Sequence, residues 1–118
     1  MRRKFFIGII NYSIIGLVQL ELTENDPEEL NVKEVEVLYH KYFIVAKTLM
    51  QSKNHDYGEA WRNMSQESFV DLILMKLQRM RQIVSNKGLT LMSEGLDANF
   101  YDMINYAVFA LILMDEQK

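Results

Sequence analysis

A single acidic side chain breaks the apolar pattern near the C-terminal end of the chain. A helix over residues 105–114 would be apolar on nearly every face. The helical period nevertheless places Asp102 on the same face as Phe109. Burial of a carboxylate without a partner costs several kcal/mol. Asp102 is therefore expected to form an ion pair with Lys76 or Arg79, or to bind a divalent cation.

Lys76 and Arg79 lie in another segment with a helical pattern, residues 66–85. The helical period puts Lys76 on the apolar face of Phe69 and Met80, with Arg79 at the border of that face. One interpretation is that the lysine extends its ammonium group to the rim of an apolar core. The other is that this face lines a pocket in which both cations meet an anion, and the sequence leaves both open.

Residues 53–62 gather hydrogen-bonding and aromatic side chains into one short polar stretch. The side chains are Lys53, His55, Asp56, Tyr57, Glu59, Trp61 and Arg62. Gly58 predicts a tight turn in the middle of this stretch. The composition is typical of a ligand-binding loop on a helical scaffold. The alternative is the capped end of a helix that Trp61 anchors.

Four helical segments are expected to position these groups. Apolar periodicity predicts helices over residues 5–22, 32–52, 66–85 and 97–116. Asp26 and Pro27 predict the start of a new segment, Ser65 predicts a cap, and the Asn-Lys-Gly sequence at residues 86–88 predicts a helix end. No segment has the pattern of a strand. The expected fold class is therefore all-α, a helical bundle of about four main helices.

The first and last of these predicted helices resemble each other in sequence. Residues 6–17 align without a gap on residues 100–111, and both copies contain the triplet Ile-Asn-Tyr. Such internal repetition predicts a division of the chain into three parts. The parts are the terminal helix of a degenerate upstream repeat at residues 1–22, a linker at 23–31, and a complete helical repeat unit carrying the site at 32–118.

The two copies differ at the charged position. Asp102 of the second copy is replaced by Gly8 in the first, whereas Asn105 is matched by Asn11. The shared asparagines are expected to serve helix packing and hydrogen bonding in both copies. Asp102 is expected to serve the chemistry.

Length and composition restrict the class of protein. The chain has 118 residues, which is typical of one domain, and a net charge of −3, which does not indicate binding to duplex nucleic acid. It has no cysteine, so a metal site would need oxygen or histidine ligands. A cytoplasmic location is expected.

The N-terminal segment has two interpretations. Basic residues at positions 2–4 followed by an apolar run resemble a secretory signal or a membrane anchor. The run is shorter than the ~20 apolar residues of a spanning helix, and its repeat counterpart lies at the other end of the chain. We therefore expect a core helix and no membrane partner. Because this helix is apolar around its circumference, either a missing half of the tandem protein or a second chain is expected to cover it, and we expect a homodimer.

An ordered set of motifs resembles a known family. The motifs are Lys-Asn-His-Asp-Tyr-Gly-Glu-Ala-Trp-Arg at residues 53–62, Asp71 with Lys76 and Arg79, Ser-Glu-Gly at residues 93–95, and Asp-Met-Ile-Asn-Tyr at residues 102–106. In this order they resemble the nucleotide modification associated domain 1 family over about residues 32–114. The helical pattern and the acidic signature are similar to the all-α nucleoside triphosphate pyrophosphohydrolases of the MazG and dimeric dUTPase type.

The resemblance implies a magnesium site. Enzymes of that type hold Mg²⁺ with pairs of acidic residues on neighbouring helices, and the metal bridges the phosphates and helps to activate a water. Asp102 and Glu94 are the implied catalytic and metal-binding carboxylates, with Asp56 or Asp97 completing the shell. The segment 66–85 departs from the pattern because it has no acidic pair one turn apart.

The resemblance also implies a nucleotide as the ligand. Side chains expected to hold its phosphates are those of Lys53, Arg62, Lys76 and Arg79. Tyr57 or Trp61 is expected to stack on the base, and Asp56 and Asn105 complete the substrate-binding set.

The leading hypothesis is a magnesium-dependent nucleotide pyrophosphohydrolase acting in nucleotide metabolism or modification. One alternative is a nucleotide-binding or regulatory helical module without catalysis, which the missing acidic pair and Gly8 favour. A further alternative is a purely structural oligomerisation unit.

Overall fold

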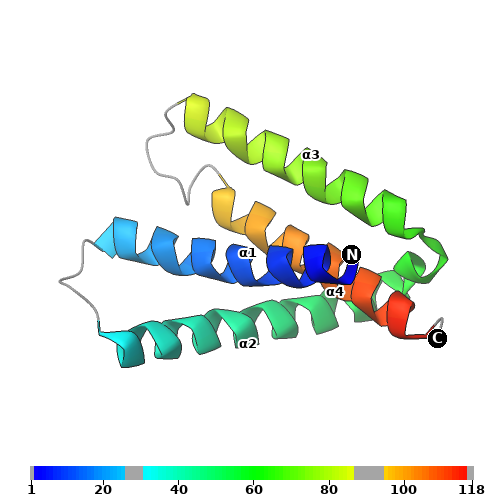
Figure 1. The fold of residues 1–118 in the computed structure, drawn as a ribbon, viewed down its shortest axis with the longest axis horizontal. Helices are drawn as coiled ribbons and strands as arrows, with labels where there is room; N and C mark the ends of the chain where they lie inside the picture. The colour runs from blue at the N-terminus through cyan, green and yellow to red at the C-terminus, as the bar shows by residue number, and fades with distance from the viewer. Residues whose placement is uncertain (1, 26–30, 87–94, 117–118) are drawn as a thin grey trace.

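The computed structural model describes residues 2–25, 31–86 and 95–116, apart from the side chains of residues 23–25 and 55–57. These residues form four α-helices, one short 3-10 helix and no strand, which confirms the all-α prediction. The elements are α1 (Arg2–Asn25), α2 (Val32–Tyr57), η1 (Ala60–Asn63), α3 (Gln66–Ser85) and α4 (Leu96–Glu116) (Figure 1).

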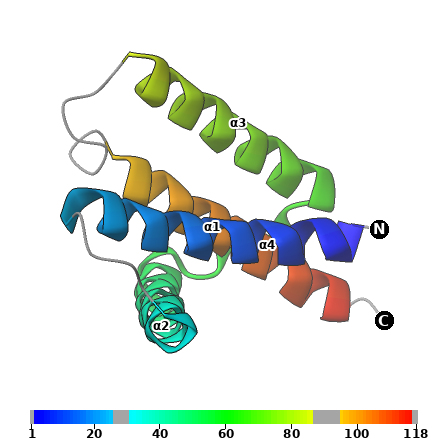
Figure 2. The same cartoon turned by 60° about the vertical axis from the view of Figure 1, so that its left-hand side comes forward.

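The central helix of the bundle is α4. It contacts α1, α2, α3 and η1, and its most extensive contact is with α1. Helices that follow one another in the chain run in opposite directions, α1 with α2 and α3 with α4 (Figure 1). Figure 2 shows α1 and α4 crossing at a shallow angle, with the N-terminal end of α1 and the C-terminal end of α4 at the same end of the bundle. Because α4 contacts all the other elements, its side chains can meet groups from α1, α2, α3 and η1.

Two clusters of buried side chains surround α4. One joins it to α1 and α3 and includes Phe6 and Phe69, both fully buried. The other joins it to α1 and α2 and includes Ile14, Leu17 and Tyr42. Burying one such apolar side chain contributes about 1.5–3 kcal/mol, so these clusters hold the bundle together.

The N-terminal helix lies in the core, as predicted from the sequence. Leu17 of α1 is 1% exposed, and Ser13 beside it is equally buried. By length and composition Arg2–Leu22 could also cross a membrane, and 39% of that window is buried in the bundle. Its basic end is tied to the bundle by ion pairs from Arg2 and Arg3 to acidic side chains of α3 and α4.

Two helix starts are capped by side chains. Ser65 caps α3 as predicted, because its Oγ accepts a hydrogen bond of 3.1 Å from the backbone N–H of Ser68. At the start of α2 the cap is Asn31, whose Oδ1 accepts a hydrogen bond of 2.9 Å from the N–H of Glu34. The start expected at Asp26 and Pro27 lies outside the described residues.

The end of α2 differs from the prediction. The helix continues to Tyr57, so the first part of the polar stretch at 53–62 is helical and not a loop. Polar side chains are compatible with an exposed helix end, and the helix stops only at Gly58, whose φ of 62° is left-handed. Consequently Lys53 is held on a rigid helix and points from it toward α4.

Glu21 joins α1 to α2 through two hydrogen bonds. Its Oε1 accepts from Lys41 Nζ at 2.7 Å and from Tyr42 Oη at 2.8 Å. These bonds, the one from Lys41 above all, lower the pKa of Glu21 below its ordinary value of 4.5. The folded state therefore favours the ionised carboxylate.

We expect this contact to stabilise the protein at neutral pH and to be lost in acid. Because the pKa of Glu21 is lower in the folded state, its contribution is complete above pH 4.5 and disappears as the pH falls through the depressed pKa. Glu21→Gln should therefore unfold at lower urea concentration than wild type at pH 7, with the difference shrinking at pH 3. Glu36→Gln, an exposed change on α2, is the control. A difference that does not vary with pH would contradict this assignment.

Candidate functional site

Asp102 is held between two lysines. Its Oδ1 accepts a hydrogen bond of 3.0 Å from Lys53 Nζ of α2, and its Oδ2 lies 3.0 Å from Lys76 Nζ of α3. The Asp102 side chain is 23% exposed. The expected ion pair with Lys76 is therefore present, and Lys53 is a second partner that the sequence did not identify. One carboxylate and two ammonium groups leave this cluster with one net positive charge.

A pocket opens beside this cluster, between α2, η1 and α4. Its volume is about 430 Å³, within the size range of small-molecule sites. Its lining consists of Lys53, Asn54, Ala60, Trp61, Met64, Asp102, Asn105, Tyr106 and Phe109. The lining combines an aromatic and apolar wall with charged groups, which is the combination that a ligand with a flat ring and an anionic group requires.

Asn105 lies in the wall of the pocket with one polar atom unpaired. The residue is 4% exposed, and its buried Oδ1 has no hydrogen-bond partner among the residues that the structure describes. Its counterpart Asn11 on α1 is exposed and accepts a hydrogen bond of 2.7 Å from Tyr39 Oη. The two copies of the motif thus occupy different environments, contrary to the expectation that their asparagines serve the same purpose.

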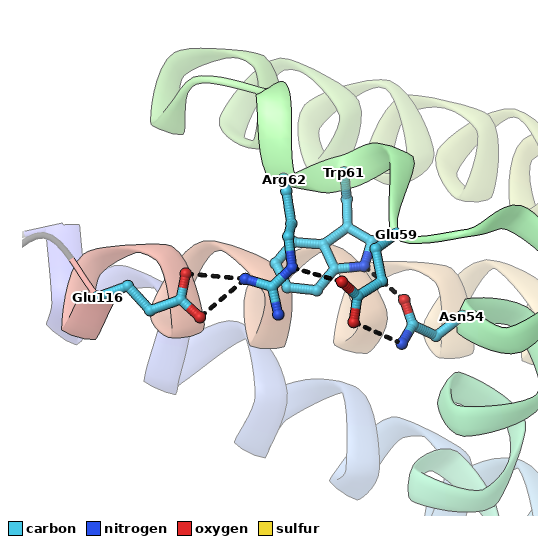
Figure 3. Close-up of polar contacts among 5 residues, drawn as sticks. All are labelled: Asn54, Glu59, Trp61, Arg62 and Glu116. Atoms are coloured by element: carbon cyan, nitrogen blue, oxygen red, sulfur yellow. Dashed lines mark hydrogen bonds and ion pairs between the residues drawn. The ribbon is translucent and has the colours of Figure 1, made fainter.

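Trp61 is fixed by three contacts within the protein. Its Nε1 donates a hydrogen bond of 2.7 Å to Asn54 Oδ1, as Figure 3 shows, and its ring stacks on Phe109 with 4.5 Å between centroids. The Arg62 guanidinium lies 4.6 Å from the Trp61 ring centroid. Trp61 therefore forms a rigid wall of the pocket, which agrees with the interpretation of Trp61 as an anchor. Its stacking on a base stays a prediction.

Arg62 is paired with two carboxylates in the described structure. It donates to Glu59 Oε2 at 2.6 Å and to both oxygens of Glu116 at 2.8 Å (Figure 3). The bond from Arg62 also lowers the pKa of Glu59, and Glu59 in turn raises the pKa of Arg62. These contacts connect η1 to the end of α4, and Arg62 does not line the pocket.

Glu59 has an unusual backbone conformation. Its φ is 60°, in the left-handed region that directly follows Gly58. A residue with a Cβ pays about 1 kcal/mol in this region, and the contacts of Glu59 with Arg62 and Asn54 offset that cost. The strained turn places η1, and with it Trp61, against α4.

Several expected site residues lie apart from the pocket. Arg79 is exposed and lines a separate hollow on α3 with Lys76. Asp97 lies at the start of α4, where its charge adds to burial in raising the pKa of Tyr101. Glu94 and the side chains of Asp56 and Tyr57 are outside the described residues.

The described residues do not fit a divalent cation at Asp102. Each carboxylate oxygen already faces an ammonium group at 3.0 Å, and two ammonium groups would repel a further cation. Within residues 2–25, 31–86 and 95–116, where side chains are described, no three His, Cys, Asp or Glu side chains gather as a metal site would need. Asp97 in particular does not join Asp102 in such a group.

Some pocket residues carried no signal in the sequence. Phe109 and Tyr106 lie in the apolar pattern of the predicted helix 97–116, which also fits a core, although Tyr106 is part of the motif at residues 102–106. Met64 lies between η1 and α3, outside the predicted helices. Asn54 was part of the polar stretch, but its contact with Trp61 depends on the continuation of α2 to Tyr57.

Comparison with known proteins finds one family match, and it covers the residues of the pocket. No curated protein and no solved structure matches the chain. The model of one family, described as nucleotide modification associated domain 1, matches residues 53–114. That stretch contains the whole lining of the pocket and both lysines that contact Asp102. Because it covers more than half of the sequence, the chain belongs to the nucleotide modification associated domain 1 family.

Proposed function

We propose that the pocket between α2, η1 and α4 binds a nucleotide. The observation that carries this proposal is the pairing of an aromatic pocket with two lysines that share one carboxylate. An aromatic wall suits a nucleobase, and the excess positive charge suits a phosphate. The description of the family, which associates it with nucleotide modification, agrees with this ligand class.

In this proposal the phosphates lie at Lys53, which lines the pocket, and extend past Asp102 toward Lys76, which contacts the other oxygen of Asp102 but does not line the pocket. The Lys53 side chain is 39% exposed and lines the pocket, so its ammonium group can reach a ligand from a rigid helix. A phosphate oxygen can replace one oxygen of Asp102 as the partner of a lysine without leaving any charge unpaired. Asp102 then acts as an internal counter-ion that keeps both lysines in place when the site is empty.

Binding without turnover is favoured over hydrolysis by the geometry at Asp102. Both of its oxygens are engaged by lysines, which removes the ligand set that magnesium chemistry requires. Magnesium-dependent pyrophosphohydrolysis therefore stays a prediction, and it depends on Glu94 and Asp56 joining Asp102. The homodimer, the cytoplasmic location and the oligomerisation unit stay predictions as well.

Calorimetric titration with nucleoside mono- and triphosphates in the presence of EDTA tests the proposal. Lys53→Gln should weaken binding about tenfold or more, because a charge-assisted hydrogen bond contributes about 1.5–3 kcal/mol. The matched control is Lys33→Gln, an exposed position about 30 Å away along α2. Absence of binding by every nucleotide, or equal losses in the two variants, would overturn the proposal.

The same titration separates binding from hydrolysis. With Mg²⁺ in place of EDTA, we expect the affinity to change little and the nucleotide to be recovered intact. Release of pyrophosphate that Asp102→Ala abolishes would instead establish the magnesium-dependent reaction.

A further inference from the structure

The aromatic wall of the pocket is carried by a very short element. Trp61 lies in η1, which spans only Ala60–Asn63 and packs on α4. A single helical turn gains little stability from its own hydrogen bonds. The backbone just before it is strained as well, because Glu59 has a φ of 60°. Side-chain contacts must therefore hold Trp61 in its place.

Arg62 provides the most extensive of these contacts. Its Nε donates to Glu59 Oε2 at 2.6 Å, and its Nη1 donates to both oxygens of Glu116 at 2.8 Å. Its guanidinium lies over the Trp61 ring, 4.6 Å from the centroid. As Figure 3 shows, one side chain thus joins the strained turn, the indole and the end of α4.

The other contacts of Trp61 do not replace this link. Asn54 accepts a hydrogen bond of 2.7 Å from the indole, and Phe109 stacks on its ring. Asn54 also reaches the strained turn, but its Nδ2 is 3.5 Å from Glu59 Oε1, at the limit of a hydrogen bond. Arg62 therefore makes the strong polar bonds that tie the turn to α4.

We propose that Arg62 is a positioning residue of the nucleotide site, and that, anchored by Glu116, it holds Trp61 where the indole completes the wall of the pocket. This inference rests on the nucleotide-binding function proposed above. Arg62 does not line the pocket, and two carboxylates already engage its guanidinium. It therefore acts on the ligand through Trp61 and not by binding a phosphate.

The physical link is the fraction of molecules in which the wall is in place. A ligand that needs the complete pocket binds only to that fraction, so its apparent affinity falls in proportion when the wall is held less firmly. The bonds to Glu116 favour the docked position of η1, whereas the strained backbone of Glu59 opposes it. Removal of the Glu116 bonds should therefore lower the docked fraction.

Glu116→Gln tests this link, because Glu116 lies at the end of α4 and does not line the pocket. Exposed ion pairs are weak singly, so we expect calorimetric affinity for the nucleotide to fall about threefold. Loss of a negative charge would by itself strengthen the binding of an anion, so the expected change has the opposite sign. Glu67→Gln is the matched control. It breaks the 2.7 Å ion pair with Arg2 and changes the net charge equally, and it should bind as wild type does.

A double-variant comparison asks whether Glu116 acts through Arg62. Arg62→Gln should weaken binding about tenfold, because the contact over the Trp61 ring and the bond to Glu59 are lost together with the Glu116 pair. Adding Glu116→Gln to Arg62→Gln should cause no further loss, since the two residues act in one network.

A second readout needs no nucleotide. Trp61 is the only tryptophan of the chain, so its fluorescence reports on the wall alone. In the ligand-free protein, Glu116→Gln should increase the quenching of Trp61 by acrylamide and speed the hydrogen exchange of the indole N–H that bonds to Asn54. The melting temperature should stay almost unchanged, and Glu67→Gln should leave both signals as in wild type.

The outcomes separate this inference from the function on which it rests. If wild type and Lys53→Gln behave as proposed but Glu116→Gln leaves affinity or Trp61 quenching unchanged, the positioning role of Arg62 is wrong and the nucleotide site stands. A further loss in the double variant would also overturn it, because Glu116 would then act independently of Arg62. Absence of nucleotide binding by wild type would overturn the proposed function, and this inference with it.

Discussion

Asp102→Asn is expected to tighten nucleotide binding about tenfold. In the wild-type protein the carboxylate competes with phosphate for both lysines, since it contacts Lys53 and Lys76 at 3.0 Å each. At an effective dielectric constant of about 20, a unit charge about 6 Å from a phosphate costs roughly 3 kcal/mol. Partial exposure of the cluster screens this repulsion to about half, and 1.4 kcal/mol corresponds to a factor of ten.

The control for this prediction is Glu36→Gln, which changes the net charge equally. It is exposed on α2, about 25 Å along the helix from Lys53, and should leave the affinity almost unchanged. Calorimetry with EDTA measures both variants. Weaker binding by Asp102→Asn, and above all a loss seen only with Mg²⁺ present, would mean that Asp102 binds metal and that the counter-ion role is wrong.

Gly16→Ala is expected to destabilise the protein by about 1–3 kcal/mol. At Gly16 the backbone of α1 approaches α4, and a Cβ there would overlap three ring carbons of Phe100. Phe100 packs against both buried clusters, which restricts the movement of its ring. Relief of the overlap would have to separate α1 from α4, the most extensive contact in the bundle.

Gly8→Ala on the same helix is the matched control. Apart from its chain neighbours and the backbone of its own helix, no described residue comes within 4 Å of the position that a Cβ would take at Gly8. Alanine is favoured over glycine inside a helix, so this variant should be more stable than wild type by about 0.5–1 kcal/mol. Urea unfolding of the two variants measures the difference. Equal stabilisation of both would contradict the close packing of α1 on α4.

The fold was largely predictable because its signals are local. Apolar periodicity predicted all four helices, the cap at Ser65 was identified by residue type, and Gly58 marks the end of α2. The error at residues 53–57 came from treating polar side chains as loop residues. A helix end can be polar when it is exposed, so only the following glycine determined the boundary.

The site was less predictable because it depends on contacts between distant segments. Burial of Asp102 required a cation, and Lys76 followed from the helical period of residues 66–85. Its second partner, Lys53, could not be inferred without knowing that α2 continues to Tyr57. Arg62 was expected at a phosphate, but its pairing with Glu116 depends on how η1 meets the end of α4.

Asn105 illustrates a further reason. Its sequence surroundings match those of Asn11, so the repeat predicted helix packing and hydrogen bonding for both residues, while the family resemblance placed Asn105 alone in the substrate-binding set. Only the three-dimensional neighbours differ, with Tyr39 beside Asn11 and the pocket beside Asn105. An internal repeat therefore predicts shared secondary structure more reliably than shared chemistry.

The most direct test of the nucleotide site is a crystal structure of the protein with Mg²⁺ and a nonhydrolysable nucleoside triphosphate. We expect the base in the pocket, beside the rings of Trp61, Tyr106 and Phe109. Phosphate oxygens should contact Lys53 and Lys76, with no metal ion on Asp102. A nucleotide bound elsewhere on the bundle, or Mg²⁺ coordinated by Asp102 with the lysines displaced, would contradict the account.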